Sequence, residues 1–575
     1  MDRQILRRIV TPIPSSKLDC HPLLARIYAS RQIQSANELE RSLEHLLPYH
    51  ALLNIDKAAS VLSQAIMQSK KIVVVGDFDA DGATSTAVAI RALKNFGAKE
   101  VAYVVPNRFT NGYGLTPELI TNIKQIGADL ILTVDNGIAN HAGVEAAKAA
   151  GIKVVITDHH LPGETLPIAD VIVNPNQHHD PFPSKNLAGV GVVFYVMLAL
   201  RRCLKEQGWF GAASLPQMAN LLDLVALGTV ADLVPLDHNN RILVHQGLRR
   251  IRGGLCVPGI VALLELSNRD FRQAEASDLG FCVAARLNAA GRLDDMSLGI
   301  ECLLTDDSHL ARQHARLLDQ LNKERRHIEF EMQAQAEKAL DQLQNHLKGE
   351  LPIGLCIFDE SWHQGVIGIL ASRIKEKYHR PVIAFAPGLD GELKGSARSI
   401  ANLHIRDALA AIDAAYPNLM KKFGGHAMAA GLTITKHFLQ DFRKIFNEVL
   451  AKKLHQDDLK HYIWSDGALM ASELCLEVAY ALRDGGPWGQ AFPEPLFDDT
   501  FRILEQRLVA DKHLKLRLTK DDLVLDAMAF FVDTSVWPDH RCQAIHAAYH
   551  LTVNEYKGRS SVQLVIEHVA KLNDC

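Results

Sequence analysis

Long apolar runs, paired cysteines and a large net charge are all missing from this chain of 575 residues. No apolar run reaches the roughly 20 residues that cross a bilayer, and the polar start MDRQILRRIV lacks the core of a secretion signal. The nine cysteines include no CxxC pair, so neither a disulfide framework nor a thiolate zinc site is expected. With a net charge of −4, any polyanion must be bound in local grooves. We therefore expect a cytoplasmic protein with reduced thiols.

Short β-branched runs alternate with helical stretches between Lys71 and about Pro175. The helical stretches end in glycine, where a helix C-cap is expected. Short apolar runs of this kind indicate strands that are buried on both faces, as in a parallel sheet. This part should form an open, doubly wound, mostly parallel α/β sheet. The predicted strands are residues 71–76, 101–105, 130–134, 153–157 and 171–173.

A chain of this length is too long for one hydrophobic core, so several domains are expected. The patterns in its second half predict three further parts. A highly charged helical pattern without Pro or Gly, from Asp307 to about Lys348, predicts a long linker helix. A second α/β domain begins near residue 353 and ends in a helix near Leu454. Short alternating stretches from about His461 onward predict a small β-barrel.

Acidic and imidazole side chains follow three of the predicted strands. Because ligands collect at the carboxyl ends of strands in open α/β sheets, these side chains should meet at one edge. Each acid alone would be an ordinary turn or helix-cap residue. Together, uncompensated acids would repel one another unless cations neutralised them. The residues are Asp77, Asp79 and Asp81 after the first strand, Asp135 after the third, and Asp158, His159 and His160 after the fourth, with Asp232 following a later helix.

The composition of this group indicates the kind of metal and of reaction. Carboxylates with one imidazole suit Mn²⁺ or Mg²⁺ better than zinc, which usually takes thiolates or several histidines. Two such ions about 3.5–4 Å apart can activate a water and stabilise the leaving oxygen in an in-line attack on phosphorus. The sequence therefore predicts hydrolysis of a phosphoester.

The segments GDFDADG, TVDNG, TDHH and LGTVADLVP resemble the four motifs of the DHH-family phosphoesterases. The resemblance implies that Asp79 and Asp81 each hold one metal ion and that Asp135 bridges both. His159 and Asp232 would complete the second site.

Three further residues of these motifs receive roles from the same resemblance. Asp77 stands near the place where small DHH pyrophosphatases have an upstream histidine, which this chain lacks, and it is assigned to the first metal site. His160 would contact the scissile phosphate. Asp158 would orient a neighbouring histidine from outside the ligand set.

The second α/β domain extends the resemblance. SWHQGVIGILASR (361–373), GSARS (395–399) and FGGHAMAAG (423–431) resemble the DHH-associated domain, whose glycines let backbone amides approach phosphates. Ser396 and Arg398 are two residues apart, so on a strand they share a face and could grip a terminal phosphate. Two structural alternatives remain. FGGHAMAAG could be a glycine-rich junction between a helix and a strand, and Arg398 could pair with an acid at the surface. The predicted substrate-binding residues are Arg108, Arg286, Arg292, Ser396, Arg398, Gly424, Gly425 and His426.

The order of parts is similar to that of the single-strand-specific exonucleases of the DHH family. The resemblance implies a monomeric 5′-to-3′ exonuclease acting on single-stranded DNA in recombination and repair, with single-strand-binding protein and a RecQ-type helicase as partners. The barrel resembles an OB-fold, which commonly binds single strands. The predicted parts are an N-terminal helical extension (1–60), a DHH phosphoesterase domain (61–306), the linker helix (307–350), the DHH-associated domain (351–455) and the OB-like domain (456–575).

Two other functions remain open at this point. The first is a DHH phosphodiesterase acting on oligonucleotides or cyclic dinucleotides, against which the length and the extra domains argue. The second is a non-catalytic DNA-binding scaffold that has lost its metals, against which the complete set of acids argues.

Overall fold

The computed structural model describes residues 3–11, 14–107, 114–346, 351–556 and 558–572. The chain forms two compact units, one of Met1–Leu6 with Lys323–Trp464 and the other of Arg7–Asn322 with Ser465–Cys575. Across these described ranges, no helix combines the length and apolarity that a membrane span requires.

The larger unit contains a five-stranded parallel sheet with the order β3-β2-β4-β5-β6. The chain passes from β2 to β3 on one side and then crosses to β4 on the other side of β2. The carboxyl ends of β2 and β4 therefore border the topological switch point, where ligands bind in such sheets. The strands are β2 (Ile72–Val75), β3 (Val101–Val104), β4 (Leu130–Val134), β5 (Lys153–Thr157) and β6 (Val171–Val173).

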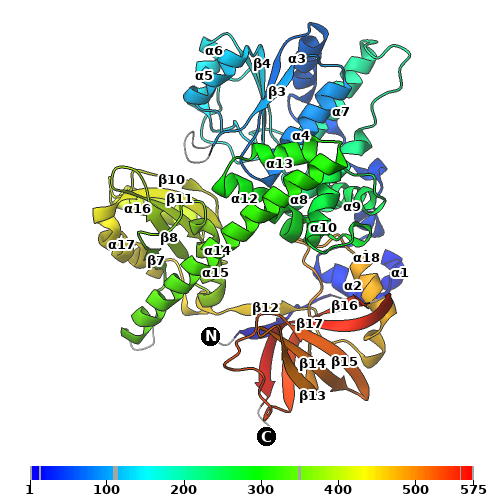
Figure 1. The fold of residues 1–575 in the computed structure, drawn as a ribbon, viewed down its shortest axis with the longest axis vertical. Helices are drawn as coiled ribbons and strands as arrows, with labels where there is room; N and C mark the ends of the chain where they lie inside the picture. The colour runs from blue at the N-terminus through cyan, green and yellow to red at the C-terminus, as the bar shows by residue number, and fades with distance from the viewer. Residues whose placement is uncertain (1–2, 12–13, 108–113, 347–350, 557, 573–575) are drawn as a thin grey trace. The chain divides into compact units, whose positions relative to one another are not determined.

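Helices cover both faces of this sheet, which confirms the doubly wound α/β prediction (Figure 1). Alternate residues of β2 enter different cores. Ile72 and Val74 pack with the helices of one face, and Val73 and Val75 with those of the other. One face carries α3 (Ile55–Met67), α4 (Ala80–Asn95) and α7 (Gly189–Glu206), and the other carries α5 (Pro117–Ile126) and α6 (His141–Ala149).

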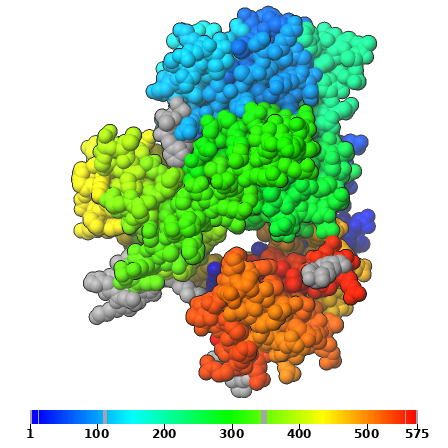
Figure 2. Space-filling view, in the orientation of Figure 1, coloured from blue at the N-terminus to red at the C-terminus, as the bar shows by residue number. Residues whose placement is uncertain are grey.

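The last part of the larger unit is a barrel, closed in the order β13-β14-β15-β17-β16. Its residues form one continuous body, coloured orange to red in Figure 2. Leu514, Leu516 and Leu518 are buried in the barrel core and alternate with half-buried or exposed positions. The barrel prediction is confirmed, although the sequence reading did not pick out β16. The strands are β13 (Phe497–Val509), β14 (His513–Lys520), β15 (Leu523–Ala529), β16 (Ala544–Tyr556) and β17 (Arg559–Leu572).

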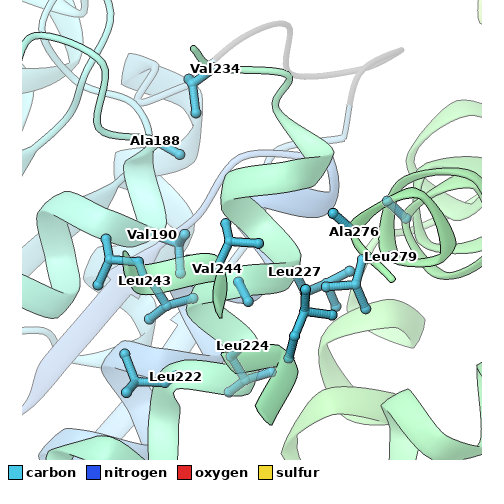
Figure 3. Close-up of a cluster of buried hydrophobic side chains, with 14 of the residues drawn as sticks. Ala188, Val190, Leu222, Leu224, Leu227, Val234, Leu243, Val244, Ala276 and Leu279 are labelled. Atoms are coloured by element: carbon cyan, nitrogen blue, oxygen red, sulfur yellow. The ribbon is translucent and has the colours of Figure 1, made fainter. Parts of the chain in front are cut away.

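A helical layer follows the sheet in the larger unit. Its buried leucines and valines interlock where α7, α8 and α9 meet (Figure 3). A π-helix (Leu279–Ala284) runs directly into α12 (Ala285–Leu293). The other helices of this unit are α1 (Ser15–Leu18), α2 (Pro22–Ser30), α8 (Leu222–Ala231), α9 (His238–Arg252), α10 (Pro258–Leu266), α11 (Ala276–Asp278), α13 (Ser297–Leu304) and α18 (Leu476–Asp484).

The smaller unit contains a mixed sheet with the order β10-β11-β9-β8-β7. Only β7 and β8 run parallel, and the other neighbours are antiparallel. The predicted linker helix is α14 (Ser308–His346), which continues from one unit into the other. β1 (Gln4–Arg7) pairs with β12 (Tyr462–Ser465). The remaining elements are β7 (Leu355–Phe358), α15 (Ile367–Tyr378), β8 (Val382–Pro387), β9 (Glu392–Arg398), α16 (Ile405–Ala415), β10 (Lys422–Gly425), β11 (Ala429–Thr435) and α17 (Leu439–Ala451).

Candidate metal centre

The loop after β2 presents three acids at the start of α4. Asp79 is the N-cap of this helix, and its carboxylate accepts a hydrogen bond of 3.0 Å from the Gly82 amide. Asp81 lies in the first turn and is buried, as is Asp77. Gly82 permits the tight turn, because a Cβ there would lie 2.5 Å from the carbonyl oxygen of Asp77. The three side chains thus lie at the carboxyl end of β2, which borders the switch point.

Asp81 is held by a helix that lies more than a hundred residues away in the chain. Its two carboxylate oxygens accept hydrogen bonds from the amides of Gly189 (2.7 Å) and Val190 (3.0 Å) at the start of α7. The positive end of the helix dipole favours a carboxylate there. Gly189 also lets Asp135 approach, since a Cβ would lie 2.5 Å from the Cβ of Asp135. No motif in the sequence indicates these two amide donors.

Asp135 occupies a backbone conformation that few residues adopt. Its φ is +62°, in the left-handed region, which Asp and Asn tolerate better than most residues. The Asp135 amide donates to the Thr157 carbonyl at 3.0 Å. The side-chain amide of Asn136 donates to the carbonyls of Val75 (3.0 Å) and Val134 (2.9 Å). Asn136, which the sequence reading did not single out, therefore holds the ends of β2 and β4 together.

Asp158 organises the two histidines that follow β5. One of its oxygens accepts from the amides of His159 (2.7 Å) and His160 (3.0 Å) and contacts Nδ1 of His160 at 2.8 Å. The other accepts from the Ile138 amide at 2.9 Å. Burial alone would lower the pKa of His160 and raise that of Asp158, but their contact moves the values to about 9 and about 2. The contact with Asp158 therefore favours the protonated form of His160.

His159 lies among carboxylates, and its surroundings favour its neutral form. Its Nε2 is 3.1 Å from Oδ1 of Asp135 and 3.4 Å from Oδ2 of Asp232. Burial, and then the charge of His160, lowers the pKa of His159. Neutral imidazole is the form that binds metal ions. Asn176 donates to the His159 carbonyl at 2.6 Å and so fixes the backbone beside it.

The predicted metal residues form two adjoining groups. Within each group, one possible ligand atom per residue lies within 4.8 Å of the others. Asp135 also groups with His159 and His160, so it lies where the two groups meet. The groups are Asp77, Asp79 and Asp135, and Asp81, His159 and Asp232.

The charges of these groups favour a bound cation. Burial, followed by repulsion from neighbouring acids, raises the pKa of Asp81 and of Asp232 to about 7 and raises that of Asp135 well above its usual value. Nε2 of His159 is buried and has no hydrogen-bond partner among the described residues. A divalent ion would neutralise the acids and give this nitrogen a partner. The residues therefore fit Mn²⁺ or Mg²⁺.

The predicted arginines of the larger unit differ in their surroundings. Arg286 pairs with Asp319 at 2.8 Å and donates to the Cys282 carbonyl at 2.8 Å, so its guanidinium already has partners within the protein. Arg292 is half-buried in the last turn of α12. Arg108 lies outside the described residues.

In the smaller unit, Ser396 and Arg398 share one face of β9, as predicted. The Arg398 guanidinium donates to the hydroxyls of Ser396 (3.1 Å) and Ser372 (3.2 Å) and to the Ala397 carbonyl (2.8 Å). It forms no ion pair with any described acid, and burial lowers its pKa. A Cβ at Gly368, in the first turn of α15, would lie 2.9 Å from this guanidinium. A largely buried guanidinium that has no counter-ion among the described residues and lies beside a helix N-terminus is suited to bind an anion.

The FGGHAMAAG segment is the turn between β10 and β11. Gly425 has a φ of +140°, and a Cβ there would lie 2.4 Å from the Cα of Ala430. Gly424 pairs with Gly431, and the His426 amide donates to the Ala429 carbonyl at 2.8 Å. Glycine is therefore required by the backbone at 425.

Comparison with known proteins gives consistent matches along the chain. The N-terminal domain of the DHH family matches residues 71–229, the DHHA1 domain matches 352–452, and the RecJ OB domain matches 465–568. The single-stranded-DNA-specific exonuclease RecJ of Dickeya dadantii is 57% identical over 95% of this chain and 96% of its own length. That of Escherichia coli is 53% identical over 98% of this chain and 99% of its own length.

Solved structures agree with this result. The crystal structure of RecJ from Thermus thermophilus in complex with Mn²⁺ has a TM-score of 0.82 at 30% identity, covering 100% of this chain and 80% of that chain. The complex of the same protein with Mg²⁺ has a TM-score of 0.76 at 28% identity, covering 100% of this chain and 79% of that chain.

Proposed function

We propose, since the chain belongs to the RecJ family of single-stranded-DNA-specific exonucleases, that it degrades single-stranded DNA from the 5′ end in recombination and repair. The observation that carries the proposal is the set of acids and His159 at the switch point of the sheet. The match over nearly the full length of the curated relatives, barrel included, favours a polymeric strand over a dinucleotide as substrate.

The residues of the two groups would hold two divalent ions, Mn²⁺ or Mg²⁺, the ions present in the Thermus thermophilus structures. When bound, two such ions activate a water and neutralise charge that develops at the phosphate during hydrolysis. Asp135 would contact both ions, because it belongs to one group and adjoins the other.

Cationic side chains of the protein would position the phosphate. His160, which Asp158 orients and whose protonated form this contact favours, is suited to donate to a phosphate oxygen beside the metal residues. Arg292 is a second candidate from α12. The binding of substrate by Arg286 stays a prediction, but its ion pair with Asp319 argues for a structural role.

Arg398 and Ser396 would bind the terminal 5′-phosphate. A terminal phosphate carries more charge than an internal one, and a guanidinium can contact it through two parallel hydrogen bonds. The lack of an acidic partner for Arg398 among the described residues supports this role. Gly424, Gly425 and His426 are retained as further substrate contacts.

The decisive experiment follows the digestion of long single strands labelled at one end or the other. With a 5′ label, release of labelled mononucleotide at the earliest times is expected; with a 3′ label, long labelled products should persist. Early loss of the 3′ label would reverse the polarity, and activity restricted to dinucleotides would favour the small-substrate alternative. Single-strand-binding protein and a RecQ-type helicase stay predictions that pull-down with the purified protein would test.

A further inference from the structure

We propose that Asn288 is a positioning residue for the metal centre, acting through the backbone of the loop that carries Asp77, Asp79 and Asp81. The inference rests on the proposed function and concerns a residue that contacts neither metal nor substrate. Asn288 lies on α12, in the segment NAAGRL, whose arginine alone was given a role from the sequence.

The first observation is a hydrogen bond between distant parts of the chain. The side-chain oxygen of Asn288 accepts from the amide of Ala80 at 2.8 Å. Ala80 is the first residue of α4 and stands between Asp79 and Asp81. The first amides of a helix have no partner within the helix, so a side chain, a water molecule or a ligand must supply one. Asp79 caps the Gly82 amide, and Asn288 caps the Ala80 amide.

The second observation is a close backbone approach one turn further along α12. A Cβ at Gly291 would lie 1.8 Å from the carbonyl oxygen of Phe78, which no side chain could tolerate without displacing the loop. Residues three apart on a helix share a face, so Asn288 and Gly291 contact the loop together. Between them they fix the backbone on both sides of Asp79.

The third observation explains how α12 itself is held. Arg286 is two residues before Asn288 and therefore points to the opposite side of the helix. There it forms an ion pair with Asp319 of α14, in which both side chains are largely buried. Largely buried pairs of this kind resist displacement, because separating them leaves an uncompensated charge. This helix is thus anchored on one side and positions the metal loop with the other.

The consequence concerns metal affinity. If the loop loses the Asn288 acceptor, the Ala80 amide must find another partner, and the carboxylates of Asp79 and Asp81 lose their fixed separation. Changes to residues that orient metal ligands typically lower affinity or activity 10–100-fold. We expect the metal affinity to fall by about tenfold, near the lower end of this range, since Gly291 would still contact the loop.

The test compares Asn288→Leu, which has no acceptor, with Asn288→Asp, which keeps an oxygen at the same place. Mn²⁺ binding to the full-length protein is followed by the electron paramagnetic resonance of the free ion, and nuclease activity is measured at saturating Mn²⁺. Asn288→Leu should bind Mn²⁺ about tenfold more weakly with little change in KM for DNA, and Asn288→Asp should restore binding to within about threefold. Asn122→Leu, an exposed change on α5, is the matched control.

Wild-type affinity and kcat in a folded Asn288→Leu protein would overturn the proposal, as would equal losses in the Leu and Asp variants. If the Leu variant does not fold, Asn288→Ser replaces it, because the hydroxyl is too short to reach Ala80. A wild-type protein that binds Mn²⁺ but does not degrade single strands would contradict the proposed function instead, and the binding comparison would still decide the role of Asn288.

Discussion

Replacement of Asp135 by Asn should have opposite effects on the activity of the protein and on its stability without metal. Asn has nearly the same shape, and it tolerates the left-handed backbone at this position, where Ala would add strain of its own. The change removes one negative charge from the place where the two groups of ligands meet. With metal it should therefore abolish hydrolysis, and without metal it should stabilise the fold.

The size of the stabilisation follows from the pKa values. The pKa of Asp81 rises from its usual 3.8 to about 7, chiefly through burial and the charge of Asp232, and this rise corresponds to roughly 4 kcal/mol once the group is ionised. Asp135 is also buried, and four acids repel it. Because the remaining acids can relax, we expect Asp135→Asn to raise the free energy of unfolding without metal by about 1–3 kcal/mol. This corresponds to a rise of a few degrees in the melting temperature measured in chelator.

The assays are thermal unfolding in chelator, thermal unfolding with Mn²⁺, and kcat on long single strands. The variant should melt higher than wild type in chelator, gain little from Mn²⁺ and lose at least about a hundredfold in kcat, or roughly 2.7 kcal/mol of transition-state stabilisation. Asp223→Asn is the matched control, since Asp223 is a buried acid at the other end of α8 from Asp232 and binds the Val257 amide. A folded Asp135→Asn protein retaining more than about a hundredth of wild-type kcat would refute the bridging role. Unchanged or lower stability in chelator would refute the argument from repulsion.

Three other outcomes are expected. In chelator the protein should lose stability as the pH rises from about 5.5 to about 8, because the folded pKa values of Asp81 and Asp232, about 7, lie above their unfolded values; a melting temperature that rises over this range would contradict the assignment. Arg398→Ala should raise KM for 5′-phosphorylated strands by roughly ten- to a hundredfold while changing KM for 5′-hydroxyl strands little, and an unchanged phosphate preference would place the terminal phosphate elsewhere. Arg31→Met should destabilise the larger unit by about 3 kcal/mol or more in denaturant unfolding, because it leaves the buried Asp466 without its closest cation; a loss below about 1 kcal/mol would show that Arg8 compensates.

Local patterns in the sequence were sufficient for the sheet and for most of the candidate site. The strands β2, β4, β5 and β6 are largely apolar and buried, and burial on both faces leaves this pattern in neighbouring residues; the edge strand β3, predicted to be buried in the same way, is half-buried throughout. Since ligands collect where such strands end, Asp77, Asp135 and His159 could be expected to meet before any coordinates were known. The domain boundaries and the roles of the individual residues stay predictions.

The barrel shows where local patterns fail. Its strand β16 carries alanines and histidines, so its alternation is weak, and only the closure of the barrel identifies it as a strand. Similarly, the sequence predicted both Arg286 and Arg398 as substrate-binding residues and could not show whether either has an acidic partner. In the structure Arg286 pairs with Asp319, and Arg398 has no acid beside it among the described residues.

The sequence by itself thus determined the parallel sheet, the long helix and the set of acids at one sheet edge, because each depends on residues that are close together in the chain. Only the tertiary structure decided which backbone amides and side-chain oxygens hold those acids in place. Gly189 donates to Asp81 across 108 residues, and Asn288 accepts from Ala80 across 208 residues. No periodicity or spacing encodes such contacts, since a hydrogen bond requires two atoms to lie within about 3 Å and folding alone brings distant segments that close.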